Sequence, residues 1–172
     1  METLEKVKPI PQICGVELDF NGELIPENSK LTQNFFNSKS SNNNWNDTYF
    51  GKKTVSFREI SKKTKPGISY QQTFKIKFPS NDESRSDRLE LFTKVKFIKI
   101  NFDNDTSAVL GRNDFFQNKL PEVKIESTEK ITTVTFTTKS IFIIGFVDAL
   151  DANSEWFNDL LPHDIPITFI NI

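Results

Sequence analysis

Residues 70–78 read YQQTFKIKF, and this stretch decides the fold class. Apolar side chains occupy positions 74, 76 and 78, and lysine fills the two positions between them. A period of two is typical of a strand with one buried face and one wet face. Pro79 ends the strand, because proline has no amide proton for a ladder hydrogen bond. The stretch therefore predicts a long strand in a half-exposed sheet.

A helix and two strands are predicted directly after this stretch. Ser80–Ser84 suits a helix N-terminus, and Leu89, Phe92 and Val95 follow at helical spacing. Apolar side chains at positions 98, 100 and 102 then alternate with polar ones and indicate a strand. Asp103–Asp105 predicts a polar turn before a short apolar segment at 108–110.

The C-terminal third predicts a hairpin, a central strand, a second helix and a last strand. Positions 123–125 and 131–138 are rich in branched and aromatic side chains and indicate paired strands. Ile141–Val147 is apolar on both faces, which favours a central or covered strand. The apolar stripe from Trp156 to Leu161 predicts a short helix that Pro162 ends, and Ile165–Ile172 predicts a terminal strand.

The N-terminal third predicts one strand and one long polar segment. Val16, Leu18 and Phe20 alternate with acidic residues and indicate a strand. Residues 27–50 are rich in Asn and Ser and predict an extended arm or loop. Val55 and Phe57 start another strand, followed by a Lys-rich bend that ends at Pro66–Gly67.

Together these elements predict a mainly β (α+β) protein. We expect an antiparallel β-sandwich or barrel-like sheet with two short helices and a long polar N-terminal arm. Residues 1–172 should form a single domain, with the 27–50 arm inside it, because no repeat or linker divides the chain.

Composition excludes several classes of function. Lys and Arg total 22 against 23 Asp and Glu, so the net charge of -1 supplies no general attraction to nucleic acid or anionic membranes. A single cysteine excludes an intrachain disulfide. Met1–Gln12 lacks the apolar stretch of a secretory signal, and the apolar run 141–147 is shorter than the roughly 20 residues that cross a bilayer. We expect a protein that is not secreted by a signal peptide.

Chemical motifs are weak. The lone histidine, His163, has no recognisable nucleophile motif beside it, and Cys14 is expected to be buried and inert. Asp19, Asn21 and Glu23 provide alternate oxygen ligands, but turn formation explains such residues more simply than calcium binding. We therefore expect no catalytic residue, no cofactor and no metal, and no small-molecule substrate.

Aromatic side chains on the polar arm are the predicted interface candidates. Aromatic anchors on a polar segment often hold partner proteins, although the same rings can fold back onto their own core. The terminal strand could also pair between subunits, with intrachain pairing as the alternative. The candidates are Phe35, Phe36, Trp45, Tyr49, Phe50, Ile167 and Phe169.

The stretch Tyr70–Asp148 resembles small virion proteins of tailed, crAss-like bacteriophages that infect Bacteroidota. The resemblance lies in the layout: a strand YQQTFKIKFP, a helix SDRLELFTKVK, a strand FIKINFDN, a VLG piece, and the paired strands EVKIES and ITTVTFTT. The sequence departs from that layout at Arg112–Phe116, where a more hydrophobic or Pro-containing piece is expected.

The resemblance implies a structural subunit of a virion. Such a protein would be a neck, ring or tail component, a head-tail connector that acts by homo-oligomeric assembly. Its partners would be other virion proteins and copies of itself, with no membrane, and DNA at most passing through a channel that Lys96 and Lys99 could face. It would be made in the host cytoplasm and located in the virion. The alternative is a non-catalytic β-sandwich binding module, possibly for carbohydrate, that uses Trp45 and Tyr49 for stacking.

Overall fold

The computed structural model of the protein describes residues 10–22, 45–48, 50–51, 53–117 and 119–148. Their strands form two separate antiparallel sheets, which confirms the predicted mainly β class. Because each strand pairs only within its own sheet, the described strands form a sandwich-like arrangement of two layers rather than one closed barrel.

The two sheets differ in how far apart their strands lie in the sequence. The first sheet contains, in spatial order, β2 (Asn46–Asp47), β1 (Ile13–Asp19), β5 (Phe97–Phe102), β6 (Thr106–Leu110) and β9 (Phe146–Asp148). The second sheet contains β3 (Val55–Thr64), β4 (Gly67–Pro79), β8 (Ile131–Ser140) and β7 (Glu122–Ser127), joined by two hairpins.

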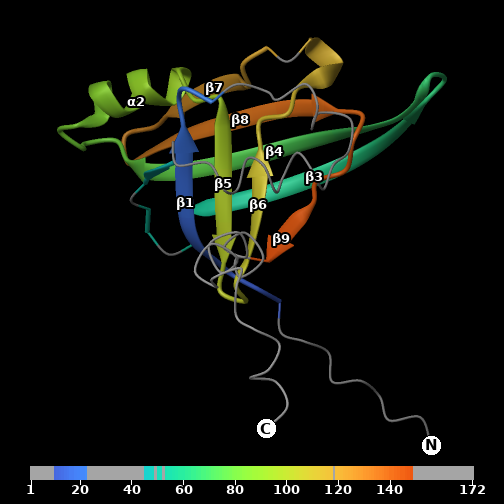
Figure 1. Ribbon diagram of the computed structural model, residues 1–172. Coiled ribbons are helices and arrows are strands. Elements are labelled where there is room, and N and C mark those ends of the chain that lie inside the picture. Colours follow the sequence, from blue (N-terminus) through green and yellow to red (C-terminus); the bar gives the residue numbers. More distant parts are fainter. Residues whose placement is uncertain (1–9, 23–44, 49, 52, 118, 149–172) are drawn as a thin grey trace, which may run out of the picture.

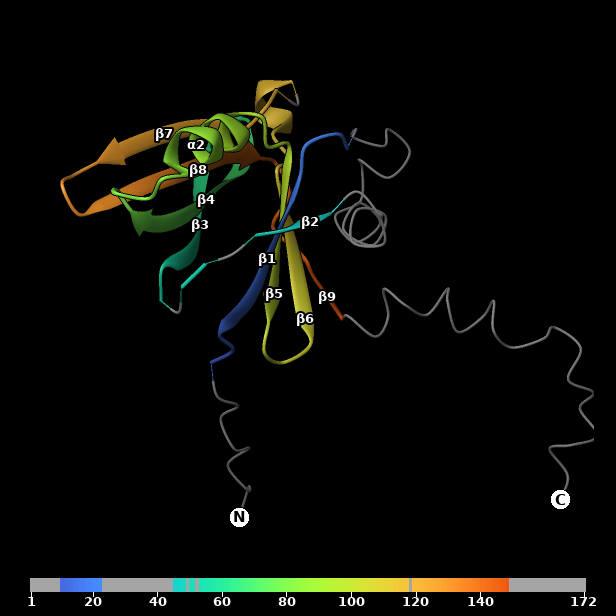
Figure 2. The same cartoon turned by 90° about the vertical axis from the view of Figure 1, so that its left-hand side faces the viewer.

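One apolar core lies between the sheets. In Figure 1 the strands of the first sheet run steeply across those of the second, and Figure 2 shows the second sheet on one side of the first. The predicted alternation in β4 is confirmed, since Phe74, Ile76 and Phe78 are buried and the residues between them are exposed or half-buried. The buried apolar side chains are Val16, Leu18, Phe74, Ile76, Phe78, Phe92, Val95, Phe97, Ile98, Ile100, Ala108, Val109, Leu110, Val134, Phe136 and Ile144.

The predicted helix after β4 is confirmed as α2 (Arg85–Thr93). Its N-cap, Ser84, makes no side-chain cap, and Asp82 instead accepts a hydrogen bond from the Ser84 amide at 3.1 Å. Phe92 is its single buried residue, and the Phe92 ring packs on those of Phe78 and Phe136 at centroid distances of 6.2 and 5.8 Å. Phe92 therefore supplies the buried apolar contact of α2 with the second sheet, and Arg85 adds hydrogen bonds to Thr132 and Ser127.

The bend predicted to end at Pro66–Gly67 is present, but it is shorter than expected, because β3 continues to Thr64. It pairs with β4 along its whole length, from Val55 opposite Ile76 to Thr64 opposite Gly67. The reversal needs only Lys65 and Pro66, since Gly67 takes φ of 137° and the Thr64 hydroxyl donates to its carbonyl at 2.8 Å. Figure 1 shows this hairpin projecting past the first sheet at the upper right.

The central strand predicted at Ile141–Val147 is also wrong. Residues 141–145 connect β8 to β9, and β9 pairs with β6 alone among the described strands. Ile141 and Ile143 are 56% and 53% exposed. A side-chain hydrogen bond takes the place of backbone strand pairing here, since the Phe142 amide donates to Ser140 Oγ at 3.0 Å.

Cys14 is exposed, which corrects the expectation that it is buried. The β1–β5 register shifts between Ile13 and Gly15, so Cys14 lies in a β-bulge and leaves the alternation that buries Val16 and Leu18. The predicted helix at 156–161, the terminal strand and most of the 27–50 arm lie outside the described residues.

Candidate interaction site

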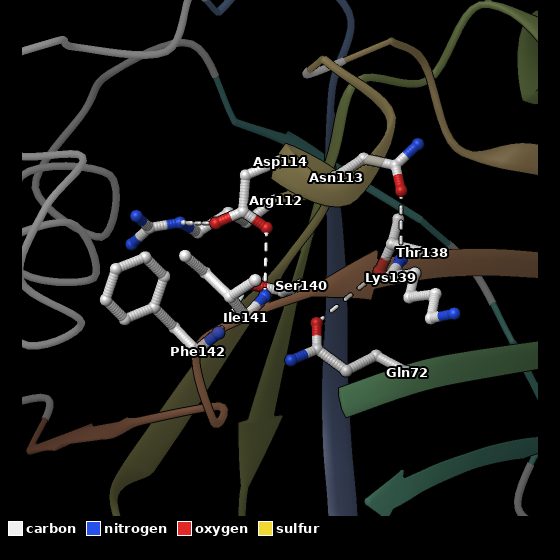
Figure 3. Close-up of polar contacts among 9 residues, drawn as sticks. All are labelled: Gln72, Arg112, Asn113, Asp114, Thr138, Lys139, Ser140, Ile141 and Phe142. Atoms are coloured by element: carbon white, nitrogen blue, oxygen red, sulfur yellow. Dashed lines mark hydrogen bonds and ion pairs between the residues drawn. The ribbon is translucent and has the colours of Figure 1, made fainter. Parts of the chain in front are cut away.

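A network of polar contacts holds the segment after β6 against the end of β8 (Figure 3). The chain leaves β6 at Gly111, whose φ of 125° is a conformation that side chains other than glycine rarely adopt. Arg112 and Asn113 then turn inward and are buried, and the short 3-10 helix η1 (Asp114–Phe116) follows. This segment and β8 together form the candidate site.

Asn113 closes the segment into a loop. Its Nδ2 donates to the carbonyl oxygens of Lys119 and Leu120 at 3.3 and 3.4 Å, and its Oδ1 accepts from the Lys139 amide at 2.9 Å. Figure 3 shows the contact between Asn113 and Lys139 of β8. A single buried amide therefore satisfies backbone groups on two separate segments, and this fixes the loop on the sheet.

Arg112 braces the other side of η1. Its Nε donates to Asp114 Oδ2 at 3.1 Å, and its guanidinium lies 3.8 Å from the centre of the Phe142 ring. Burial lowers the pKa of the Arg112 guanidinium, and the ion pair with Asp114 opposes that shift. The cation is thus enclosed between a carboxylate and an aromatic face, a stable arrangement for a buried arginine.

Asp114 and Glu59 tie the β8–β9 connection to its surroundings. Asp114 Oδ1 accepts from the Ile141 amide at 3.2 Å. Glu59 Oε2 accepts from the Ile144 amide and from Gln72 Nε2, both at 2.9 Å. The connection is therefore held by carboxylates from two elements, η1 and β3.

Three exposed apolar side chains stand on this braced loop, and we name them the apolar platform: Phe115, Phe116 and Leu120. They are 43%, 52% and 49% exposed. The two phenylalanine rings meet edge to face at 5.6 Å, and Lys139 Nζ lies 4.0 Å from the centre of the Phe115 ring. Because the three side chains lie together on the surface, they form a candidate contact surface.

A groove of about 660 Å³ runs between the platform and the second sheet. The apolar part of its wall comes from Phe115, Phe116 and Leu120. The polar part of its wall comes from side chains of the loop and of the strands. The other lining residues are Gln71, Asn113, Gln117, Lys119, Glu122, Thr137, Thr138 and Lys139. An apolar wall beside a polar floor can take a partner's apolar side chain together with its backbone.

Of the seven interface candidates from the sequence, only Trp45 and Phe50 lie among the described residues. Both are half-buried and pack partly against the core. Phe50 also lines a second hollow, of about 530 Å³, together with Phe78 and Ile131. Phe35, Phe36, Tyr49, Ile167 and Phe169 lie outside the described residues, so their predicted role stays a prediction.

Lys99, a predicted channel-facing cation, is engaged within the protein. Its Nζ lies 3.2 Å from Glu17 Oε2 and 5.8 Å from the centre of the Trp45 ring, and its side chain is 17% exposed. Asn101 Nδ2 donates to the same Glu17 oxygen at 2.8 Å. Lys99 and Glu17, two charges on the outer face of the first sheet, are thus paired with each other.

Polar residues weighed for metal binding have structural partners. Asp19 is buried, and its Oδ1 accepts from the amides of Asn21 and Gly22 at 2.9 and 2.7 Å, which is the turn role expected for it. Asp103 Oδ1 accepts from the Gln12 amide at 3.0 Å. Within the described ranges no group of three His, Cys, Asp or Glu side chains is placed to hold a metal ion.

Comparison of the chain with protein-family models, with curated proteins and with solved structures finds no match. In the part of the chain that the structure describes, no helix has the length and apolar content to cross a membrane. The platform and its brace are therefore interpreted from their own geometry.

Sequence reasoning missed the platform. Positions 112–116 read RNDFF, and the sequence indicated them only as a departure from the layout of the virion proteins that Tyr70–Asp148 resembles. A signal was present: two adjacent phenylalanines follow Asn and Asp in a segment without strand or helix periodicity. Because Asn and Asp favour turns, the rings beside them had no predicted sheet face on which to pack.

Proposed function

We propose that the protein is a structural subunit that acts by assembling with copies of itself and with other proteins. The observation that carries this proposal is the apolar platform, in which exposed Phe115, Phe116 and Leu120 are held by the buried Arg112 and Asn113. Anchors held rigidly before binding lose little entropy when a partner covers them, and aromatic side chains are frequent among such anchors.

The open edges of the second sheet supply further contact surface. β3 and β7 are the outermost strands of that sheet among the described residues, and each has one edge without a neighbouring strand. Edges of this kind can pair with a strand of another subunit. The platform groove adjoins β7, since Glu122 lines it.

Within this proposal, the assembly is the neck, ring or tail of a tailed-phage virion. The basis is the resemblance of Tyr70–Asp148 to small virion proteins of tailed bacteriophages. The elements of this stretch follow one another in the order that the resemblance implies: β4, α2, β5, β6, β7 and β8. A ring subunit needs surfaces for two neighbours, because a head-to-tail ring joins unlike faces. A platform and a separate sheet edge meet that need.

The test is the mass of the full chain in solution, measured by native mass spectrometry and light scattering at increasing concentration. We expect an oligomer, and we expect Phe115→Ser with Phe116→Ser to raise its dissociation constant by at least about 30-fold, because an anchor residue contributes about 2 kcal/mol or more. Leu91→Ser with Ile131→Ser is the matched control, since these residues are 50% and 47% exposed elsewhere on the surface. A monomer at every concentration would contradict the proposal.

A further inference from the structure

Positive charge is concentrated on one hairpin of this nearly neutral protein. The whole chain has a net charge of -1, but residues 53–77 contain seven basic side chains and a single acidic one, Glu59. The basic residues are Lys53, Arg58, Lys62, Lys63, Lys65, Lys75 and Lys77. Net charge alone hides this separation, and a local cluster of like charge sets the local potential.

The strand register separates the acidic from the basic side chains. Glu59 lies opposite the buried Gln72, and its carboxylate accepts hydrogen bonds from Gln72 and the Ile144 amide on the inner side of the sheet. Arg58 lies opposite Thr73, and Lys75 and Lys77 follow at alternate positions of β4. These positions alternate with the buried ones, so their side chains share the outer face.

We name the outward cations of this hairpin the basic face: Arg58, Lys62, Lys75 and Lys77. No member has an ion-pair partner within 4 Å among the described carboxylates. Half-buried threonines, Thr73, Thr135 and Thr137, lie in the same rows of β4 and β8. Two carboxylates of β7 lie in the same rows, Glu122 opposite Thr137 and Glu126 opposite Thr133, and Glu126 interacts electrostatically with Lys75. On the hairpin itself, every charged side chain of the outer face is a cation.

The spacing of the basic face matches an extended polyanion. Strand residues two apart lie about 7 Å from each other, which separates Lys75 from Lys77. Lys62 pairs with Ser69, eight residues along β4 from Lys77, so the face extends over roughly 26 Å at 3.3 Å per residue. A duplex presents phosphates on both strands at intervals of 3.4 Å along its axis, which supplies several phosphates over that length.

We infer that the basic face binds the phosphate backbone of a double-stranded nucleic acid. A protein partner fits the face less well, because lysine is depleted in the cores of protein interfaces. Protection of an edge strand explains lysines on β3 but not Lys75 and Lys77, since β4 lies between β3 and β8. This inference does not depend on assembly through the apolar platform.

The experiment measures binding of the full chain to a labelled 20-base-pair DNA duplex by fluorescence anisotropy, at salt concentrations from 50 to 200 mM. The test variant carries Lys62→Gln, Lys75→Gln and Lys77→Gln. The control carries Lys63→Gln, Lys94→Gln and Lys130→Gln, which removes the same charge from exposed positions off the basic face. Thermal unfolding of both variants verifies that they are folded.

We expect the wild type and the control to bind with similar affinity. The test variant should bind more than about tenfold more weakly at 50 mM salt, and its slope of log K against log salt should fall by about 2.7, or 0.9 for each lost phosphate contact. Equal slopes for the test and control variants would overturn the inference, and so would failure of the wild type to bind the duplex at 50 mM salt. Equally tight binding of polyglutamate would assign the face to an acidic protein instead.

Discussion

At the residue scale, Gly111 permits the sharp exit from β6 that places Arg112 and Asn113 under the platform. Its φ is 125°, and a Cβ atom built there would lie 2.3 Å from the Lys96 carbonyl oxygen and 2.9 Å from the Phe97 Cα. Both obstacles are backbone atoms of the β5 entry, so they cannot rotate away. Position 111 therefore needs glycine for two separate reasons, backbone conformation and space.

Gly111→Ala should destabilise the fold by about 3 kcal/mol or more, because strain and a backbone clash add together. Gly67 separates the two causes: its φ is 137°, but a Cβ there meets nothing within 4 Å. Gly67→Ala should cost only about 1 kcal/mol. Urea unfolding of the two variants beside the wild type measures the difference. Equal losses would mean that space at Gly111 does not matter.

At the element scale, Phe92 is the fully buried side chain through which α2 packs on the second sheet, beside half-buried Leu89 and hydrogen bonds from Arg85 to Thr132 and Ser127. Phe92 is 3% exposed and contacts the rings of Phe78 and Phe136, whereas its neighbour Leu91 is 50% exposed. The ion pair between Lys94 and Glu90 at the end of the helix lies at the surface, where such pairs contribute little. Burial of the Phe92 ring is therefore expected to contribute more to holding α2 than this surface ion pair does.

Phe92→Ala should lower the free energy of unfolding by about 3–5 kcal/mol, the usual cost of a large cavity in an aromatic core. Leu91→Ala, one position earlier on the same helix, should change it by less than about 0.5 kcal/mol. Chemical denaturation followed by circular dichroism gives both values. Similar effects of the two substitutions would show that α2 is not held through Phe92.

At the scale of the whole molecule, the two proposed surfaces adjoin on the outer side of the second sheet. The groove of the apolar platform is lined by Gln71 of β4 and by Thr137 of β8, and Thr137 lies opposite Thr73, in the row that contains Arg58. Figure 1 shows the β3–β4 hairpin reaching beyond the rest of the fold. The basic face continues along this hairpin past the groove to Lys62.

Independence of the two adjoining surfaces can be tested, because the substituted side chains come from different elements, η1 for one surface and β3 and β4 for the other. Phe115→Ser with Phe116→Ser should leave the salt slope of duplex binding by the monomer unchanged. The triple Lys→Gln variant at positions 62, 75 and 77 should keep the wild-type oligomer mass. Substitutions without shared partners usually have additive effects. If either variant altered the other property by more than about threefold, the two surfaces would be parts of one interface.

Strands β1, β4 and β5, the helix α2 and the β7–β8 hairpin could be predicted from the sequence alone. Period-two alternation in 70–78 and helical spacing at 89, 92 and 95 are local patterns, and the same local side chains fill the core. The period-two pattern did not predict the strand at 58–64, and the apolar run at 141–147 wrongly predicted a central strand. Lysines on both faces of β3 are tolerated because the hairpin projects into water, and the apolar 141–145 segment crosses between the sheets.

The sequence by itself determined the mainly β class, because alternation depends only on neighbouring residues. Only the tertiary structure decided where the candidate surfaces lie. Asn113 and Lys139 are 26 residues apart, and Asp114 and Ile141 are 27 apart, yet their contacts hold the platform outward. The basic face likewise depends on which side of the second sheet packs on the first. Contacts between distant segments determine which side of the second sheet packs on the first, and no local sequence pattern indicates it.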